Sequence, residues 1–206
     1  MSFSDLAALT IHDVKNQLAQ LASDAEQRGD GHSLCISLNA SEALTRLLCY
    51  YRSEEKILAV NIEPESPEEM ISDLLRVLKK NCEQRPQIQI KTTLELAPAV
   101  WFYDKVLIQM ILNNALQNAL RYAASTVNLN VIEQDHQLEI RIQDDGEGYP
   151  QATLEEADHL APISAEGTGL GLRLARRVVE QHIHQGRSGR IVLSNHTGAQ
   201  FSLFLP

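Results

Sequence analysis

The sequence predicts an α+β protein in which an N-terminal antiparallel helical hairpin is followed by a two-layer α/β sandwich. Two observations favour this fold class. In the first 53 residues, apolar side chains recur at helical spacing in two stretches that a short Gly-containing turn separates. Beyond them, segments in which apolar and polar residues alternate are interspersed with further helical patterns, as expected for a mixed sheet with helices on one face.

The hairpin is expected to occupy residues 1–56. Its first helix is predicted over 4–28, where apolar residues alternate spacings of four and three, the seam of a coiled coil or helix bundle. A second helix is predicted over 33–53. Because one hairpin cannot cover its own apolar stripe, we expect a homodimer built on a four-helix bundle. The seam residues of the first helix are Ala7, Ile11, Val14, Leu18, Leu21 and Ala25.

The sandwich is expected to occupy residues 57–206. Residues 63–67 and 134–136 are predicted turns, and 98–102 is a short extended link. The acidic, turn-rich stretch 149–166 is predicted to be a loop that can move, and loops of this length in a compact domain tend to be functional. The predicted strands are 57–62, 87–96, 127–133, 137–143, 190–194 and 199–205, and the predicted helices are 67–83, 103–123 and 170–182.

The composition is that of an acidic globular protein. A formal net charge of -9 argues against a nucleic-acid surface and leaves partners with basic patches open. Cys35, Cys49 and Cys82 form no Cys-x-x-Cys motif, which fits a reducing compartment. No apolar run approaches the roughly 20 residues that cross a bilayer, and no signal peptide is visible. We therefore expect a cytoplasmic protein without a membrane span.

Two glycine-containing clusters suggest a nucleotide pocket. Asp144–Gly148 follows a strand-like run, and a carboxylate there can accept hydrogen bonds from an amino group on a planar ring. Gly167–Leu172 opens a helix-like run, where glycines let the backbone approach an anion and leave N–H groups pointing at it. Each cluster alone is weak evidence, since Gly-x-Gly is common in turns. The pattern is neither a dinucleotide fingerprint nor a P-loop.

A polar stripe on the predicted helix 103–123 adds to this evidence. Asn114, Asn118, Arg121 and Tyr122 recur at i, i+4, i+7 and i+8 and therefore share one face. Asparagine oxygens suit Mg²⁺, an arginine can meet a phosphate, and a tyrosine can stack on a base. The residues alone leave open a second interpretation, in which the asparagines satisfy buried backbone groups.

The first helix carries a candidate nucleophile outside its seam. His12, Lys15, Asn16 and Ala19 lie on an outward strip, and Asp13 adjoins the histidine. A single histidine on a helix is most often only a solvated side chain. The grouping shifts the interpretation, because an exposed imidazole beside a carboxylate is a nucleophile with a base or orienting group at hand. The Asn16 amide could hold a water or a ligand oxygen.

Taken together, these stretches resemble a two-component sensor histidine kinase core from end to end. Residues 12–18 resemble the phosphoacceptor box, 114–122 the N box, and 144–148 and 167–172 the two glycine boxes, while 198–206 resemble the final strand of such catalytic domains. Four motifs in this order are highly specific. The resemblance implies a dimerising hairpin followed by an ATP-binding domain of the Bergerat (GHKL) type, shared with gyrase, Hsp90 chaperones and MutL.

The resemblance also implies cofactors and roles. ATP and Mg²⁺ would bind, with Asn118 coordinating Mg²⁺ and Asn114 beside it. His12 would take the γ-phosphoryl group, Asp13 would act as base or orienting acid, and Asn16 would position water for dephosphorylating a partner. The implied nucleotide contacts are Arg121 to phosphate, Tyr122 and Asp144 to adenine, Gly146 and Gly148 as pocket-shaping residues, and Gly167, Thr168, Gly169, Leu170 and Gly171 around the triphosphate.

The implied activity is that of a histidine protein kinase, which phosphorylates itself on His12 and passes the phosphoryl group to the receiver domain of a response regulator. It could also dephosphorylate that regulator, and a separate sensor protein would supply the signal. Three alternatives stay open. They are an ATP-independent phosphotransfer relay with a degenerate kinase domain, a phosphatase that acts through Asn16, and a serine kinase or ATPase machine built on the same pocket.

Three departures from the family pattern bear on this expectation. Gln17 stands where many members have a proline that bends the first helix, so a weaker bend is expected. Asp145 stands where asparagine is usual. Residues 149–166 contain no phenylalanine, so the box that contains one in the lid is missing. A shortened lid puts lid closure and the autokinase rate in question.

Overall fold

The computed structural model describes residues 3–81, 87–155 and 170–206. The chain divides into two compact units, Met1–Leu58 with Val77–Glu83, and Ala59–Arg76 with Gln84–Pro206. The last part of helix α3 (Pro67–Asn81) groups with the first unit, although it follows the predicted boundary at 56/57 in the sequence. That boundary therefore stays a prediction. Within the described ranges, no helix is long and apolar enough to cross a membrane.

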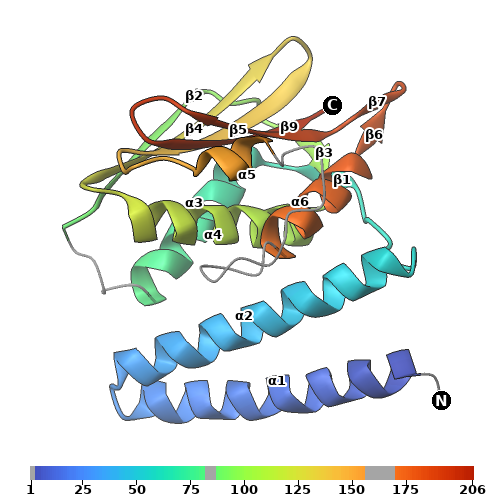
Figure 1. The fold of residues 1–206 in the computed structure, drawn as a ribbon, viewed down its shortest axis with the longest axis vertical. Helices are drawn as coiled ribbons and strands as arrows, with labels where there is room; N and C mark the ends of the chain where they lie inside the picture. The colour runs from blue at the N-terminus through green and yellow to red at the C-terminus, as the bar shows by residue number, and fades with distance from the viewer. Residues whose placement is uncertain (1–2, 82–86, 156–169) are drawn as a thin grey trace. The chain divides into compact units, whose positions relative to one another are not determined.

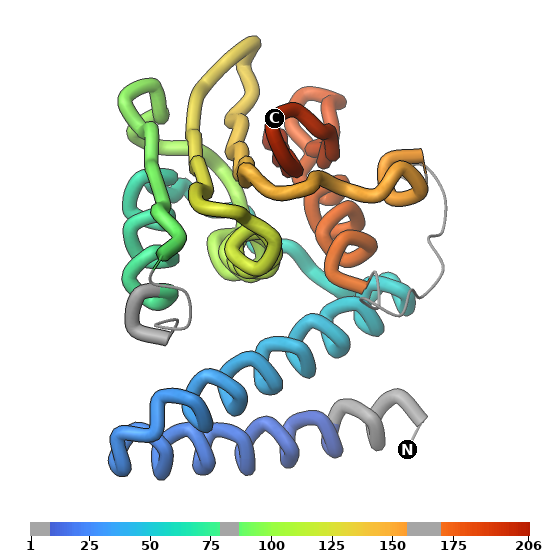
Figure 2. Tube along the Cα trace, turned by 60° about the vertical axis from the view of Figure 1, so that its left-hand side comes forward, coloured from blue at the N-terminus to red at the C-terminus, as the bar shows by residue number. Residues whose placement is uncertain are grey.

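Helices α1 (Phe3–Gln27) and α2 (Gly31–Glu54) form the predicted hairpin and lie side by side (Figure 1, Figure 2). The turn between them begins the second helix with a cap. The Asp30 carboxylate accepts hydrogen bonds from the Ser33 N–H (3.1 Å) and the Ser33 hydroxyl (2.6 Å). Both bonds hold the pKa of Asp30 below its usual value, and the bond from the Ser33 hydroxyl has the larger effect.

The apolar stripe of the hairpin is covered only in part within one chain. Near the turn, Ala22, Ala25 and Cys35 are buried. Two predicted seam residues, Val14 and Leu21, keep 37% and 54% of their surface exposed. A long helix that leaves large apolar side chains exposed along one stripe has surface available for a second helical partner.

The second unit is built on a five-stranded sheet with the order β2-β4-β5-β9-β8. β2 pairs with β4 in parallel, and the other neighbours are antiparallel. Helices α3, α4 and α6 lie on one face of the sheet (Figure 1), so the predicted fold class is confirmed. The strands are β2 (Gln89–Leu96), β4 (Thr126–Gln134), β5 (Gln137–Asp144), β8 (Arg190–Asn195) and β9 (Ala199–Leu205), and the helices are α4 (Lys105–Tyr122) and α6 (Leu170–Glu180).

Alternation along β5 sorts its side chains between the two faces of the sheet. Leu138, Ile140 and Ile142 are fully buried in the core, while Glu139 and Arg141 belong to the opposite face. Helix α4 supplies the matching apolar side chains of the core, because its residues at helical spacing are also fully buried. These are Ile108, Leu112 and Leu116.

The predicted strand over 57–62 is wrong. Those residues have no regular structure, and the strand is instead β1 (Glu63–Glu65), which pairs antiparallel with β3 (Trp101–Tyr103). A competing partner explains the difference, because the Asn61 N–H donates to the Asp104 carboxylate (2.9 Å) rather than to a strand. The expected turn at 63–67 and the expected link at 98–102 therefore contribute the strands of a small two-stranded ribbon.

A second ribbon, β6 (Ile183–His184) with β7 (Arg187–Ser188), has no counterpart in the sequence prediction. Its two turn residues, Gln185 and Gly186, have φ of 49° and 76°, as in the tight turns that suit hairpins. Each strand is too short to give a recognisable alternation. The stretch 149–166 contains one described helix, α5 (Gln151–Glu155), and residues 156–166 of the predicted loop lie outside the described residues.

Candidate functional site

Helix α4 carries the predicted polar stripe on the part of its surface that the core leaves free. Asn114 is half-buried, and Asn118, Arg121 and Tyr122 are exposed. The Arg121 guanidinium lies 5.5 Å from the centre of the Tyr122 ring, within cation–π range. Exposure of Asn118 argues against the interpretation that this side chain satisfies a buried backbone group. The stripe is thus open to a ligand.

Asp144 ends β5 on the face of the sheet that the helices cover. It is 4% exposed, and its Oδ1 atom accepts hydrogen bonds from the N–H groups of Gly146 (2.9 Å) and Ala199 (3.1 Å). These two bonds fix the orientation of the carboxylate. Because both end on Oδ1, the second oxygen keeps its capacity to accept from an amino group on a planar ring.

The loop after Asp144 runs against the end of α4. A Cβ atom on Gly146 would lie 2.2 Å from the backbone oxygen of Tyr122, which no side chain tolerates, so this position needs glycine. Gly148 has φ of 87° and lies beside the Asn195 side chain. The first glycine cluster therefore lies next to the C-terminal end of the helix that carries the polar stripe.

The second glycine cluster also meets the stripe. Helix α6 begins at Leu170, and a Cβ atom on Gly171 would lie 2.6 Å from Nδ2 of Asn114. Gly171 thus permits a close approach between the first turn of α6 and the Asn114 amide. The free N–H groups of a first helical turn favour an anion. The remaining predicted residues of this cluster, Gly167, Thr168 and Gly169, lie outside the described residues.

Asn195, which lies outside the predicted motifs, shapes the same region. Its Oδ1 accepts from the Tyr149 N–H (2.8 Å) and its Nδ2 donates to the Tyr149 carbonyl (2.9 Å). Burial, followed by the nearby Asp144 carboxylate, raises the pKa of the Tyr149 hydroxyl. No sequence pattern marks Asn195, because its partner is distant in the chain and only the folded sheet brings the two together.

Asp145 orders the neighbouring connection between α4 and β4. Its carboxylate accepts hydrogen bonds from the N–H groups of Ala124, Ser125 and Thr126 at 2.9 to 3.1 Å, and from the Ser125 hydroxyl at 2.5 Å. These hydrogen bonds hold the pKa of Asp145 well below its usual value, and the Ser125 hydroxyl has a larger effect than the backbone donors. This departure from the family pattern thus has a structural explanation.

The first unit brings together the three residues of the predicted phosphoacceptor group. His12 and Asp13 keep 72% and 77% of their side-chain surface exposed on α1. The His12 Nδ1 atom lies 3.8 Å from Oδ1 of Asp13 and 3.3 Å from Nδ2 of Asn16. Asp13 and Asn16 both lie near Nδ1, which leaves Nε2 as the ring nitrogen for a reaction with a ligand.

A metal ion would have to be held differently from a usual protein site. In the part of the chain that the structure describes, no three His, Cys, Asp or Glu side chains gather into a group that could hold one. Asn118, the predicted ligand, is exposed and offers one amide oxygen. This donor set fits Mg²⁺, which keeps several waters and binds mainly through substrate phosphates.

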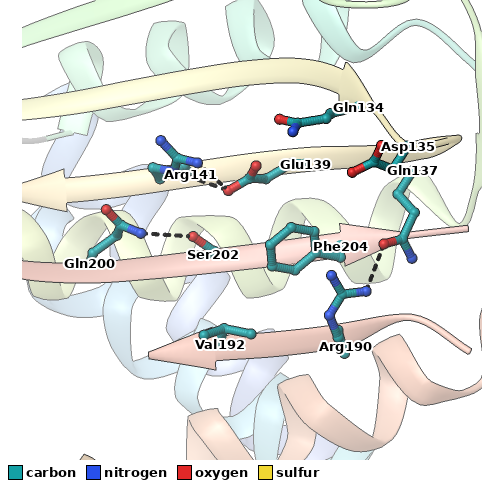
Figure 3. Close-up of a pocket in the computed structure, with 10 residues that line it drawn as sticks. All are labelled: Gln134, Asp135, Gln137, Glu139, Arg141, Arg190, Val192, Gln200, Ser202 and Phe204. Carbon is teal, nitrogen blue, oxygen red and sulfur yellow. Dashed lines mark hydrogen bonds and ion pairs between the residues drawn. The ribbon is translucent and has the colours of Figure 1, made fainter. Parts of the chain in front are cut away.

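A cavity of about 320 Å³ lies on the uncovered face of the sheet (Figure 3). There the Arg141 guanidinium donates two hydrogen bonds to Oε1 of Glu139 (3.0 and 2.7 Å), and Arg190 donates to Gln137 (2.7 Å). Because side chains alternate along β5, this cavity and Asp144 are on opposite faces of the sheet. The cavity is therefore separate from the candidate site.

Residues 103–206 match the family model described as histidine kinase-, DNA gyrase B-, and HSP90-like ATPase. The signal transduction histidine-protein kinase AfsQ2 of Streptomyces coelicolor is 37% identical over 107 residues, which are 48% of this chain and 19% of that protein. The virulence sensor histidine kinase PhoQ of Salmonella typhimurium is 26% identical over 203 residues, which are 89% of this chain and 39% of that protein. The chain thus spans less than half the length of these curated relatives.

A solved structure agrees at the level of the fold. The structure of full-length ShkA in complex with AMPPNP matches with a TM-score of 0.68 and 17% sequence identity, over 98% of this chain and 45% of that chain. At this identity, the likeness concerns the fold alone.

Proposed function

Because this chain belongs to the family of histidine kinase-, DNA gyrase B- and HSP90-like ATPases, we propose that it is a protein-histidine kinase that phosphorylates itself on His12 from MgATP. One observation carries the proposal. The exposed group of His12, Asp13 and Asn16 occurs on the same chain as the ATPase domain. An acceptor histidine on a helical hairpin is what a histidine kinase needs beside its ATPase domain, so the group points to the kinase branch.

In the proposed nucleotide site, residues from different elements bind the adenine and the phosphates of ATP. Asp144 accepts from the adenine amino group, and Tyr122 faces the ring. Arg121 meets phosphate, and the first turn of α6, with Gly171, cradles the triphosphate. The glycine cluster 167–169 would extend this cradle. The burial of Asp144 and the exposure of the α4 stripe support the assignment.

Asn118 is the residue that would hold Mg²⁺, with Asn114 beside it. When bound, the ion offsets phosphate charge at the developing transition state. The chain itself contributes the orientation of these amides. Gly171 leaves room for the Asn114 amide, since a Cβ atom at this position would lie 2.6 Å from Nδ2 of Asn114.

The phosphoryl step makes a specific demand on the His12 tautomer. Nε2 attacks the γ-phosphorus, the Nε2–P bond forms, and the bond to the ADP oxygen breaks. The attacking nitrogen needs a free lone pair, so the ring proton must be on Nδ1. Asp13 can accept that proton in a hydrogen bond, as can Asn16 once its amide presents Oδ1 rather than Nδ2. Asp13 would favour the reactive tautomer once its carboxylate, 3.8 Å from Nδ1, rotates to hydrogen-bond distance.

The partners we propose follow from the same scheme. The phosphoryl group passes to a receiver-domain aspartate of a response regulator that docks on the hairpin, and Asn16 positions water when the regulator is dephosphorylated. Two copies of residues 1–56 pair through the exposed seam, and residues 57–206 form the catalytic domain. A separate sensor protein is the proposed input. Because the phosphoryl donor is ATP, we place the reaction in the cytoplasm.

A second candidate is an ATP-independent relay or phosphatase with a degenerate kinase domain. The lack of phenylalanine in residues 149–166 favours it, because a lid without that box closes less well over nucleotide. Such a protein would still use His12 or Asn16 toward a receiver domain but would bind MgATP weakly.

Incubation with γ-labelled ATP and Mg²⁺ tests the proposal. We expect an acid-labile, alkali-stable phosphoprotein, and His12→Gln should abolish the label while leaving ATP binding intact. Asp144→Asn should abolish both. Label that persists in His12→Gln would refute the acceptor assignment. A protein that takes no label from ATP, yet takes phosphate from a phosphorylated receiver domain, would establish the relay instead.

A further inference from the structure

His182 lies just after α6 and connects two elements of the second unit. The side chain is 1% exposed, its Nε2 accepts a hydrogen bond from the Asp104 backbone N–H (3.0 Å), and its Nδ1 lies 2.9 Å from the Val178 carbonyl oxygen. A backbone N–H only donates and a carbonyl only accepts, so the ring is neutral with its proton on Nδ1. Burial lowers the pKa of His182, which favours the same state.

Asp104, the partner of His182, organises the start of α4. Its Oδ1 caps the helix by accepting from the Leu107 N–H (2.9 Å), and its Oδ2 accepts from the Asn61 N–H (2.9 Å). Asp104 is buried, so each of these bonds replaces one with water. A single residue thus joins the first turn of α4, the segment before β1 and, through His182, the end of α6.

The two helices that carry the candidate site pack against each other, and polar groups mark two of their contacts. Asp104 meets His182 where α4 begins and α6 has ended, and Asn114 meets Gly171 where α6 begins. These contacts are on the order of 15 Å apart along each helix, at a rise of 1.5 Å per residue. Because both helices also pack on the sheet, the hydrogen bond at one end and the close approach at the other refine the angle between two helices that are already packed.

We infer that His182 is a positioning residue for the nucleotide site, because its hydrogen bond to Asp104 fixes the angle between α4 and α6 and so the approach of Gly171 to Asn114. His182 touches no nucleotide in this scheme and acts only through the two helices. The inference rests on the proposed function in one respect, namely that the Gly171–Asn114 contact belongs to a nucleotide pocket.

Two amide substitutions separate the hydrogen bonds of the ring. His182→Gln carries its oxygen near the place of Nε2 and can still accept from the Asp104 N–H. His182→Asn reaches only the place of Nδ1, so it can donate to the Val178 carbonyl but leaves the Asp104 N–H without its acceptor. We expect His182→Asn to raise the Kd for AMPPNP with Mg²⁺ roughly tenfold, and His182→Gln to stay within about twofold of the wild type.

A stability-matched control separates positioning from general loosening. Val131 is fully buried in β4 and is outside the proposed site, so Val131→Ala should lower the melting temperature without changing nucleotide affinity. In nucleotide-free protein, NMR should show shifted signals for the Gly171 amide and the Asn114 side-chain amide in His182→Asn, but unchanged signals in Val131→Ala.

The outcomes distinguish this inference from the proposed function. If His182→Asn binds AMPPNP as tightly as the wild type, or if Val131→Ala loses as much affinity, the positioning role is overturned. If wild-type protein binds no nucleotide, the proposed function fails, and the NMR signals of Gly171 and Asn114 still decide whether His182 sets that contact. Unchanged signals in His182→Asn would refute it, and shifted signals would support it.

Discussion

For two neighbouring residues, Asp144 and Asp145, the local sequence predicts the role of one side chain and not that of the other. The sequence marks Asp144 because it ends an alternating strand and precedes glycines, and the structure buries it on the covered face with two backbone donors. Nothing local marks the role of Asp145. Its donors, from Ala124 to Thr126, lie just before and at the start of β4, and only the pairing of β4 with β5 brings them to it.

Replacement of Asp145 should lower stability in a way that depends on pH. Asp145→Ala leaves the N–H groups of the α4–β4 connection without their shared acceptor, so we expect a lower melting temperature at pH 7. The bonds depress the pKa of Asp145, so their contribution is present above the ordinary carboxyl pKa of about 3.9 and is lost as the pH falls through the lower folded-state value. Wild type and variant should converge on acidification.

Circular dichroism melts from pH 7 downwards check this expectation. Asp145→Asn is the matched control, because it keeps one acceptor oxygen and should lie between the other two proteins at pH 7. Equal melting temperatures of wild type and Asp145→Ala at pH 7 would show that these hydrogen bonds add nothing to stability.

Alanine substitutions at two glycines should have different consequences. At Gly171 the added Cβ meets the flexible end of Asn114, which can rotate, so we expect a folded protein with roughly tenfold weaker MgATP binding. At Gly146 the added Cβ meets the backbone oxygen of Tyr122, so we expect a lower melting temperature and no nucleotide binding. Gly31→Ala is the control, since nothing lies within 4 Å of its added Cβ.

Calorimetric titration with AMPPNP and thermal melts of the three variants measure these effects. If Gly171→Ala binds AMPPNP with wild-type affinity, the Gly171–Asn114 contact does not contribute to nucleotide binding. If Gly146→Ala has the melting temperature of the wild type, the loop can move away from Tyr122 without loss of stability.

At the scale of elements, the long periodic segments are the ones that the sequence determines. Both hairpin helices, α4, α6 and the five strands of the main sheet follow from periodicity and end within a few residues of the prediction. The short elements depend on tertiary contacts. The Asn61 N–H donates to the Asp104 carboxylate and not to a neighbouring strand, and the β6–β7 ribbon has strands of only two residues. The resemblance to histidine kinases, which rests on several motifs in a fixed order, is confirmed by the match of residues 103–206 to the ATPase family model.

The exposed seam of α1 predicts how the hairpin associates. Leu21 is a large apolar residue with more than half of its surface exposed, so a charge there should oppose packing against a second hairpin. We expect Leu21→Glu to convert a dimer into a monomer, as measured by light scattering after gel filtration. Ala19→Glu, which adds the same charge on the outward strip, should remain dimeric. A dimer in both variants would place the interface elsewhere.

At the scale of the whole molecule, the two units divide the proposed reaction between them. The acceptor group on α1 belongs to the first unit, and Asp144, α4 and α6 belong to the second. Neither unit contains both reactants. Phosphoryl transfer therefore requires that the units meet productively, and the rate should depend on the segment that joins them, where residues 57–62 have no regular structure.

Separate expression of residues 1–56 and 57–206 tests this division and the predicted boundary together. We expect 57–206 to bind AMPPNP as the whole chain does and to take no label from ATP by itself. Added hairpin should become labelled on His12, at a rate that rises with its concentration because the tether no longer supplies a high effective concentration. A hairpin with His12→Gln is the control and should stay unlabelled. If 57–206 fails to fold, the grouping of Val77–Glu83 with the first unit gives the physical reason, and the boundary at 56/57 is wrong. If 57–206 labels itself, the acceptor is not on the hairpin.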